Sequence, residues 1–229
     1  AYAYIAEKLS ATKKKHGPDS IAGFSSARVT NEENYIFQKF IGTVIGTNNV
    51  DHCARLCHAS TVAGLATTFG SGAMTNSIDE TEFMKTIFVI GSNTTEQHPV
   101  IGMKIKRAVR QNGAQLIVAD PREIDLVKYS VLWLRHRPGT DVALLNGMMN
   151  VIISENLLDK KYIENRTEGF EEVKKVVQKY TPEYAEKITA VPAEDIKKAA
   201  RIYAGNGAAS IFFSMGITQH TTGVDNVKS

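Results

Sequence analysis

The feature that most constrains the fold is a pair of short, continuous apolar segments, IFVI at residues 87–90 and LIV at residues 116–118. Residues 99–111 lie between them and have helical spacing. Short apolar runs joined by a helix are typical of parallel strands that are buried on both faces. We expect further strands at residues 130–134 and 210–213, and helices at residues 141–156, 159–165, 169–180 and 193–204. The sequence therefore predicts an α/β fold, with a Rossmann-like parallel sheet flanked by helices.

Polar turns follow each predicted strand, at residues 91–93, 120–122, 137–141 and 215–219. Because the carboxyl ends of parallel strands meet at one edge, we expect these loops to form a single rim where nucleotides bind. Each loop also has a simpler explanation, because glycine and proline build turns and Thr140 or Asp141 could cap a helix. The first loop lacks the GxGxxG pattern, which argues against an ordinary nicotinamide site.

Two carboxylates on this predicted rim suit particular parts of a nucleotide. Asp120 ends the second strand, where Rossmann-type sites hold a ribose diol. Asp141 is predicted to be exposed, and one carboxylate can accept the adjacent N1–H and N2–H donors of guanine.

The N-terminal residues predict a smaller α/β segment. A helix over residues 3–15 should stop at Gly17, and a short strand is expected at residues 20–25. Thr30 and Glu33 have the spacing of a capping box at the start of a second helix. The apolar stripe along that helix is predicted to be core, and it consists of Phe37, Phe40, Ile41 and Val44.

The segment VDHCARLCHASTVAGL, residues 50–65, fits neither an amphipathic helix nor an alternating strand. Its Cys57-His58 pair could hold a late transition metal and move a proton, since thiolate is a soft ligand and imidazole titrates near neutrality. The alternative is a buried free cysteine beside a hydrogen-bonded histidine. Cys53 and Cys57 are the only cysteines, so they cannot complete a four-thiolate site, and we expect no iron–sulfur cluster within the chain.

Composition excludes several classes of protein. A formal charge of +3, from 27 basic and 24 acidic side chains, does not indicate a nucleic-acid partner. No apolar run approaches the roughly 18 residues of a membrane helix, and the N-terminus lacks the order of a signal peptide. Two cysteines are too few for a disulfide framework. We expect a soluble cytoplasmic protein, with the periplasm as the alternative, and both ends indicate a domain cut from a longer polypeptide.

A family resemblance favours the functional interpretation of the Cys57-His58 pair. NNVDHCARLCHASTVAGL resembles the metal-ligand segment of formate dehydrogenase catalytic subunits, which are members of the molybdopterin oxidoreductase family. Further similar segments follow the family's order: SSARVTNEENY, IGTNN, GAMTNSI, VIGSN, QHP, ADPR, RPGTDVALLN, RTEGFE and MGITQH. The resemblance implies the central domains of a fold like that of formate dehydrogenase and DMSO reductase. It suggests that residues 1–49 belong to a discontinuous neighbouring domain, and that residues 50–229 form one dinucleotide-binding-like domain with the metal-ligand loop.

The resemblance also implies a cofactor and its contacts. The metal would be molybdenum or tungsten, held by two copies of molybdopterin guanine dinucleotide and by Cys57. His58 would accept a proton or orient the oxyanion, and Arg28 would lie near the pterin, although a solvated loop arginine is the alternative. The other residues implied at the cofactor are Gly91, Asn93, Glu96, Asp120, Arg122, Gly139, Asp141, Met215, Gly216 and Gln219.

The implied reaction is the two-electron oxidation of formate to carbon dioxide, with electron-transfer subunits or domains as partners. The family's four-cysteine segment is absent, so a 4Fe-4S cluster is expected only outside this chain, which by itself should not turn over formate. Two alternatives stay open. One is a relative such as a nitrate reductase, although those relatives resemble CM where this chain has Cys57-His58. The other is a noncatalytic scaffold subunit of the same fold.

Overall fold

The computed structural model describes residues 1–229, which form two compact units, Ala1–Ala59 and Ser60–Ser229. We call these the first and the second unit. The sequence-based boundary between residues 49 and 50 lies inside the first unit. By their contacts, Cys57 and His58 therefore belong with the N-terminal residues. The assignment of residues 50–229 to one dinucleotide-binding domain stays a prediction.

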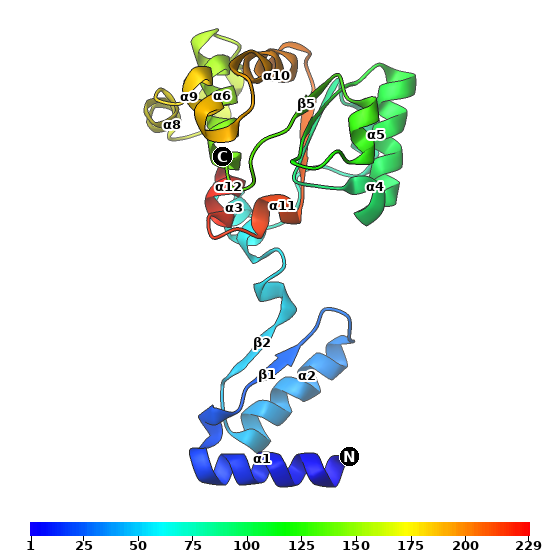
Figure 1. The fold of residues 1–229 in the computed structure, drawn as a ribbon, viewed down its shortest axis with the longest axis vertical. Coiled ribbons are helices and arrows are strands. Elements are labelled where there is room, and N and C mark those ends of the chain that lie inside the picture. Colours follow the sequence, from blue (N-terminus) through cyan, green and yellow to red (C-terminus); the bar gives the residue numbers. More distant parts are fainter. The chain divides into compact units, whose positions relative to one another are not determined.

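The first unit contains two helices and a small parallel sheet. Its elements are α1 (Tyr2–His16), β1 (Gly23–Ser25), α2 (Asn31–Lys39), a π-helical turn (Phe40–Ile45) and β2 (Val50–His52), with 3-10 turns at Pro18–Ser20 and Cys53–Arg55. The helix α1 ends at His16, just before Gly17, which agrees with the predicted stop, and Gly17 has a positive φ of 84° that favours glycine. The strands β1 and β2 pair in parallel, with Ser25 opposite His52, and α2 lies alongside β1 (Figure 1).

Ile21, Ile41 and Ile45 form the small core of the first unit, together with Phe37. The prediction for Phe40 and Val44 is wrong, because both side chains are exposed. The amide of Gly46 donates to the carbonyl of Ile41, five residues earlier, so the last turn is wider than an α-helical turn. Side chains four residues apart stay on one face of such a turn, and this places Ile41 and Ile45 inward.

The capping box at the start of α2 is confirmed. The amide of Glu33 donates to the Thr30 hydroxyl at 3.2 Å, and the amide of Thr30 donates to the Glu33 carboxylate at 2.8 Å.

The second unit is built on a four-stranded parallel sheet in the order β5-β4-β3-β6, which confirms the predicted sheet. The strands are β3 (Thr86–Ile90), β4 (Gln115–Ala119), β5 (Leu132–Leu134) and β6 (Ala209–Phe213). The helices are α3 (Ala59–Phe69), α4 (Thr94–Gln97), α5 (Pro99–Asn112), α6 (Asp141–Ser154), α7 (Lys160–Arg166), α8 (Phe170–Val177), α9 (Pro182–Thr189), α10 (Ala193–Gly205), α11 (Met215–Thr218) and α12 (Gly223–Lys228), with 3-10 helices at Asp79–Phe83 and Asp125–Tyr129.

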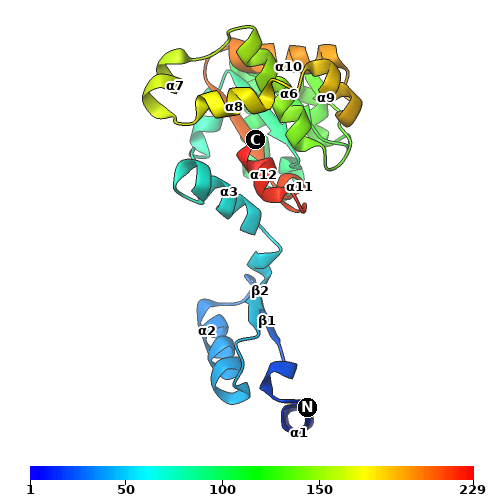
Figure 2. The ribbon, with the colours of Figure 1, turned by 90° about the vertical axis from the view of Figure 1, so that its left-hand side faces the viewer.

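Helices cover both faces of this sheet (Figure 1). The helix α5 packs on one face, over a core that includes Ile87 and Leu116. The helices α6 and α10 pack on the other face, over a core that includes Phe88 and Ile117. Figure 2 shows α8 and α9 beside α6. Neighbouring residues of one strand thus face different cores, which explains the continuous apolar runs.

Several helices of the second unit were not predicted, among them α9 and α3. The helix α9 follows Thr181, whose hydroxyl accepts the amide of Tyr184. The helix α3 occupies the end of the segment that fits neither helix nor strand by pattern. The buried face of α3 contains small residues, so the sequence shows no helical pattern of large apolar side chains. At Gly64 the approach is so close that an added Cβ would lie 2.6 Å from Val227 of α12. Close packing against α12, rather than periodicity, accounts for this helix.

Candidate functional site

The loops after β3, β4, β5 and β6 all leave the sheet at its carboxyl edge, because the strands are parallel. We call them the rim. The loops after β3 and β6 touch through two glycines, since the amide of Gly216 donates to the carbonyl of Gly91 at 3.0 Å. A Cβ at Gly216 would lie 2.7 Å from the Cα of Gly91, and Gly91 itself has a φ of 57°. Only bare backbone fits here, and such a surface lets a ligand approach closely.

The loop after β3 and the start of α4 contain polar atoms that have no partner in the protein. Asn93 Oδ1, Thr94 Oγ1 and Thr95 Oγ1 are buried and make no hydrogen bond. Glu96 lies in α4 and is exposed. Buried polar atoms cost free energy unless they are paired, so this cluster is suited to a polar ligand. Thr94 and Thr95 were missed from the sequence, although two threonines directly after a strand-ending loop could have signalled them.

Asp120 follows β4 and is 9% exposed. Its Oδ1 accepts the amide of Arg122 at 2.8 Å, and its carbonyl accepts the indole N–H of Trp133 at 2.9 Å. Arg122 is exposed. The carboxylate is therefore held in a fixed turn beside the chain's single tryptophan.

Asp141 follows β5 and corrects the sequence-based prediction, because it is 2% exposed rather than open to solvent. Its Oδ1 lies 2.9 Å from Nε2 of His136, and both side chains are 3% exposed. Asp141 Oδ2 and His136 Nδ1 are buried without partners. Asp141 is the first residue of α6, and pairing with His136 draws its carboxylate inward. Sequence reasoning missed His136, and only its place just after a buried strand could have marked it. Gly139, between the two, is exposed with a φ of 78°.

The loop after β6 begins α11. Met215 is half-buried, whereas Gly216 and Gln219 are exposed. The carbonyl of Gly216 accepts a hydrogen bond from Nε2 of His220 at 2.8 Å. The second unit thus brings the predicted residues of the four loops to one edge of the sheet.

The remaining predicted residues, Arg28, Cys57 and His58, lie in the first unit. The loop with Arg28 follows β1, and the turn with Cys57 follows β2, so the parallel pairing places both at one edge of the small sheet. The Arg28 loop and the turn after β2 are joined by a hydrogen bond between neighbouring residues: the amide of Ala27 donates to Sγ of Cys53 at 3.2 Å. Arg28 and Cys57 are exposed and His58 is half-buried. No three His, Cys, Asp or Glu side chains come together as a metal site anywhere in residues 1–229.

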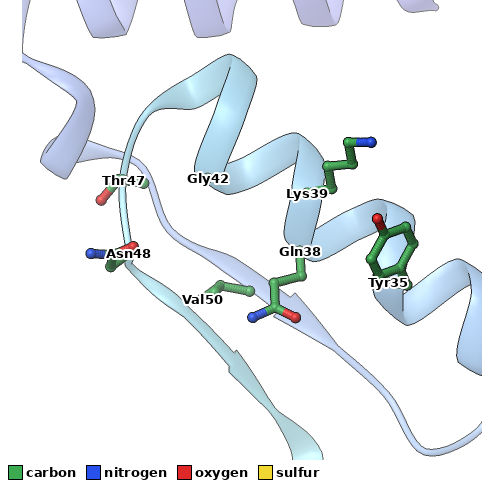
Figure 3. A pocket seen from close by; sticks show the side chains of 7 residues that line it. All are labelled: Tyr35, Gln38, Lys39, Gly42, Thr47, Asn48 and Val50. Carbon is green, nitrogen blue, oxygen red and sulfur yellow. The ribbon is translucent and has the colours of Figure 1, made fainter.

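One open pocket of about 250 Å³ also lies in the first unit (Figure 3). It is lined by Tyr35, Gln38, Lys39, Gly42, Thr47, Asn48 and Val50. None of these is a predicted site residue.

A doubly covered parallel sheet with polar loops along its carboxyl edge is the architecture of proteins that bind nucleotide cofactors. The chain belongs to the molybdopterin oxidoreductase family, whose model matches residues 1–229. Membership, with similarity to formate dehydrogenases, implies a molybdenum- or tungsten-pterin cofactor. No helix is both long and apolar enough to cross a membrane.

Similar proteins include formate dehydrogenases from archaea and bacteria. The chain is 53% identical, over 97% of its length, to F420-dependent formate dehydrogenase 1 subunit alpha of Methanococcus maripaludis. It is 48% identical, over 99% of its length, to formate dehydrogenase H of Escherichia coli. The structure of acetylene hydratase from Pelobacter acetylenicus matches 98% of the chain with a TM-score of 0.76 and 31% identity. The chain spans about a third of the length of these proteins, 33%, 32% and 30% respectively.

Proposed function

We propose that this chain is part of the catalytic subunit of a formate dehydrogenase, which oxidises formate to carbon dioxide, a proton and two electrons. The observation that carries the proposal is the 53% and 48% identity to two formate dehydrogenases over nearly the whole chain. The Cys57-His58 pair favours this reaction over that of a nitrate reductase. The retained thiol, imidazole and rim loops favour it over a noncatalytic scaffold.

The cofactor we propose is the guanine dinucleotide form of molybdopterin, two copies per metal, with one copy on the rim. The unpartnered atoms Asn93 Oδ1 and Asp141 Oδ2 support it, because a buried acceptor without a partner suits a donor that arrives with the ligand. Asp120 would hold the ribose and Arg122 the pyrophosphate. Asp141 would accept the guanine N–H donors, while the bare backbone at Gly91 and Gly216 leaves room for the ligand. The other rim contacts proposed are Glu96, Gly139, Met215 and Gln219.

Three residues of the first unit, Cys57, His58 and Arg28, would each have a separate role in the reaction. The Cys57 thiolate would ligate molybdenum or tungsten, since soft sulfur suits such metals. His58 would take up the proton that formate releases, and the Arg28 guanidinium would bind an anionic part of the pterin. The bound group would supply the acceptor for the two electrons. Electron-transfer subunits or domains would then receive them, and any 4Fe-4S cluster would lie outside this chain.

The test uses the full-length polypeptide loaded with its cofactor, and it measures metal content, pterin content and dye reduction by formate. We expect Cys57→Ser to lose activity by orders of magnitude while pterin stays bound, because a hydroxyl is a poor ligand for a soft metal. We expect His58→Gln to lose about 10²- to 10⁴-fold, with a flattened acidic limb of the pH-rate profile.

Cys53→Ser is the matched control, because it makes the same thiol-to-hydroxyl change one turn away and should retain the metal. Reduction of nitrate without oxidation of formate would overturn the proposed substrate. Full activity of Cys57→Ser would overturn the proposed ligand.

A further inference from the structure

We propose that Cys53 and Cys57 form a reversible disulfide in the cofactor-free protein, which keeps Cys57 from binding metal until the bond is reduced. Only the effect on metal binding rests on the proposed function, in which Cys57 is the metal ligand. The bond itself is inferred from the spacing and exposure of the two cysteines in the first unit.

The two cysteines lie one turn apart. The amides of Leu56 and Cys57 both donate to the carbonyl of Cys53, each at 3.1 Å. A backbone bond from residue i+4 to residue i, as in a helical turn, separates the two Cα atoms by about 6 Å, from the rise and radius of the α-helix. Disulfides span Cα separations of this size. Cβ atoms four residues apart on a helical turn lie about 5–6 Å apart and a disulfide brings them to about 4 Å, so the turn after β2 must tighten when the bond forms. Both cysteines are free and exposed, and they are the only two in the chain, so just one intramolecular pairing exists.

In the reduced state, the sulfur of Cys53 makes a contact that the disulfide would remove. Sγ of Cys53 accepts the amide of Ala27 at 3.2 Å and lies 3.8 Å from Nδ1 of His52. Turning Cys53 toward Cys57 removes the sulfur from Ala27, so the loop that carries Arg28 loses its contact with the turn after β2. The carbonyl of Ser26 keeps its bond from the Asn34 amide group at 3.2 Å, which limits the loosening to the tip of the loop. The oxidation state of the thiols is therefore coupled to the Arg28 loop.

The chemistry needs a two-electron oxidant, for which we name hydrogen peroxide. One thiolate attacks a peroxide oxygen, which gives a sulfenic acid and releases water after protonation. The second thiolate attacks that sulfur, forms the S–S bond and expels the sulfenic oxygen as a second water. Two thiols are oxidised and one peroxide is reduced to two waters. A dithiol reductant reverses the bond by thiol–disulfide exchange.

The test treats the cofactor-free chain with one equivalent of hydrogen peroxide and measures its intact mass. We expect a monomer that has lost two hydrogen atoms, and recovery of the original mass with dithiothreitol. Arg55 lies between the cysteines, so trypsin places them on separate peptides that stay joined only through the disulfide. Amide exchange at Ala27 should become faster on oxidation.

Cys53→Ser separates the outcomes, because serine keeps an acceptor for the Ala27 amide but cannot form the bond. The variant should gain oxygen on Cys57 and show no change in exchange at Ala27. Oxygen on both sulfurs of the parent chain, or a disulfide between two chains, would overturn the inference. Either result would leave the formate test untouched, since no metal or formate is used here.

Discussion

At the scale of single residues, the rim depends on the backbone contact between Gly91 and Gly216. The two glycines follow neighbouring strands, and the Gly216 amide bonds to the Gly91 carbonyl at 3.0 Å. A side chain on either would meet backbone rather than a flexible side chain. The contact thus fixes how closely the loops after β3 and β6 approach each other.

We predict that Gly216→Ala destabilises the second unit by about 1–3 kcal/mol, the usual cost of overpacking a close contact. Gly205→Ala is the control, because a Cβ there would have nothing within 4 Å. Alanine at this position should stabilise the folded state by up to about 1 kcal/mol, because it lowers the conformational entropy of the unfolded chain. Urea unfolding followed by the fluorescence of Trp133 measures both. Equal effects of the two substitutions would contradict the role of the contact.

At the scale of elements, a cluster of ion pairs ties the 3-10 helix Asp79–Phe83 to α5. Lys104 lies 2.9 Å from Asp79 and 3.0 Å from Glu82, and Arg107 lies 3.0 Å from the same Glu82 oxygen. The hydrogen bond from Lys104, helped by the charge of Arg107, lowers the pKa of Glu82. The hydrogen bonds to Asp79 and Glu82 raise the pKa of Lys104.

The lowered pKa of Glu82 predicts a pH-dependent contribution to stability. A carboxyl whose pKa is lower in the folded state stabilises above its unfolded pKa, about 4.3, and this stabilisation is lost as pH falls through the folded pKa. Glu82→Gln should therefore lower the urea midpoint at pH 7, and the difference from the parent should vanish in acid because protonated glutamate is also neutral. Glu123→Gln, at an exposed position, is the control. The same difference at every pH would show that charge plays no part.

At the scale of the whole molecule, the order β5-β4-β3-β6 gathers loops from distant parts of the sequence into one rim. The second unit buries this sheet under two apolar layers, so its strands hold the loops rigidly. Trp133 bonds to the carbonyl of Asp120 on this rim and therefore reports on it.

We predict that the chain binds GDP at the rim and that binding changes the fluorescence of Trp133. Asp141→Asn keeps an oxygen for His136 but replaces an acceptor by a donor, so affinity for GDP should fall about tenfold or more, as for one lost hydrogen bond to a charged group. Affinity for ADP should not change. Asp159→Asn, which removes a charge but keeps a good helix cap, is the control. Equal GDP affinity of Asp141→Asn and the parent would contradict the guanine assignment.

The sequence by itself determined the features that depend on neighbouring residues. The buried strands show as continuous apolar runs, Gly17 ends α1, and Thr30 with Glu33 starts α2, because each signal lies within a few residues. The parallel sheet, and with it the common edge of the four loops, followed from these local signals. The family also followed, since the segments that resemble it keep their order and residue types.

Only the tertiary structure decided which side chains meet. Asp141 is buried because β5 and α6 bring it to His136, and Phe40 is exposed because a π turn redirects the end of its helix. The contact of Gly91 with Gly216 and that of Ala27 with Cys53 each join residues far apart in the sequence. Periodicity records the average burial of one face, whereas a hydrogen bond or a close packing contact depends on the partner that folding places opposite.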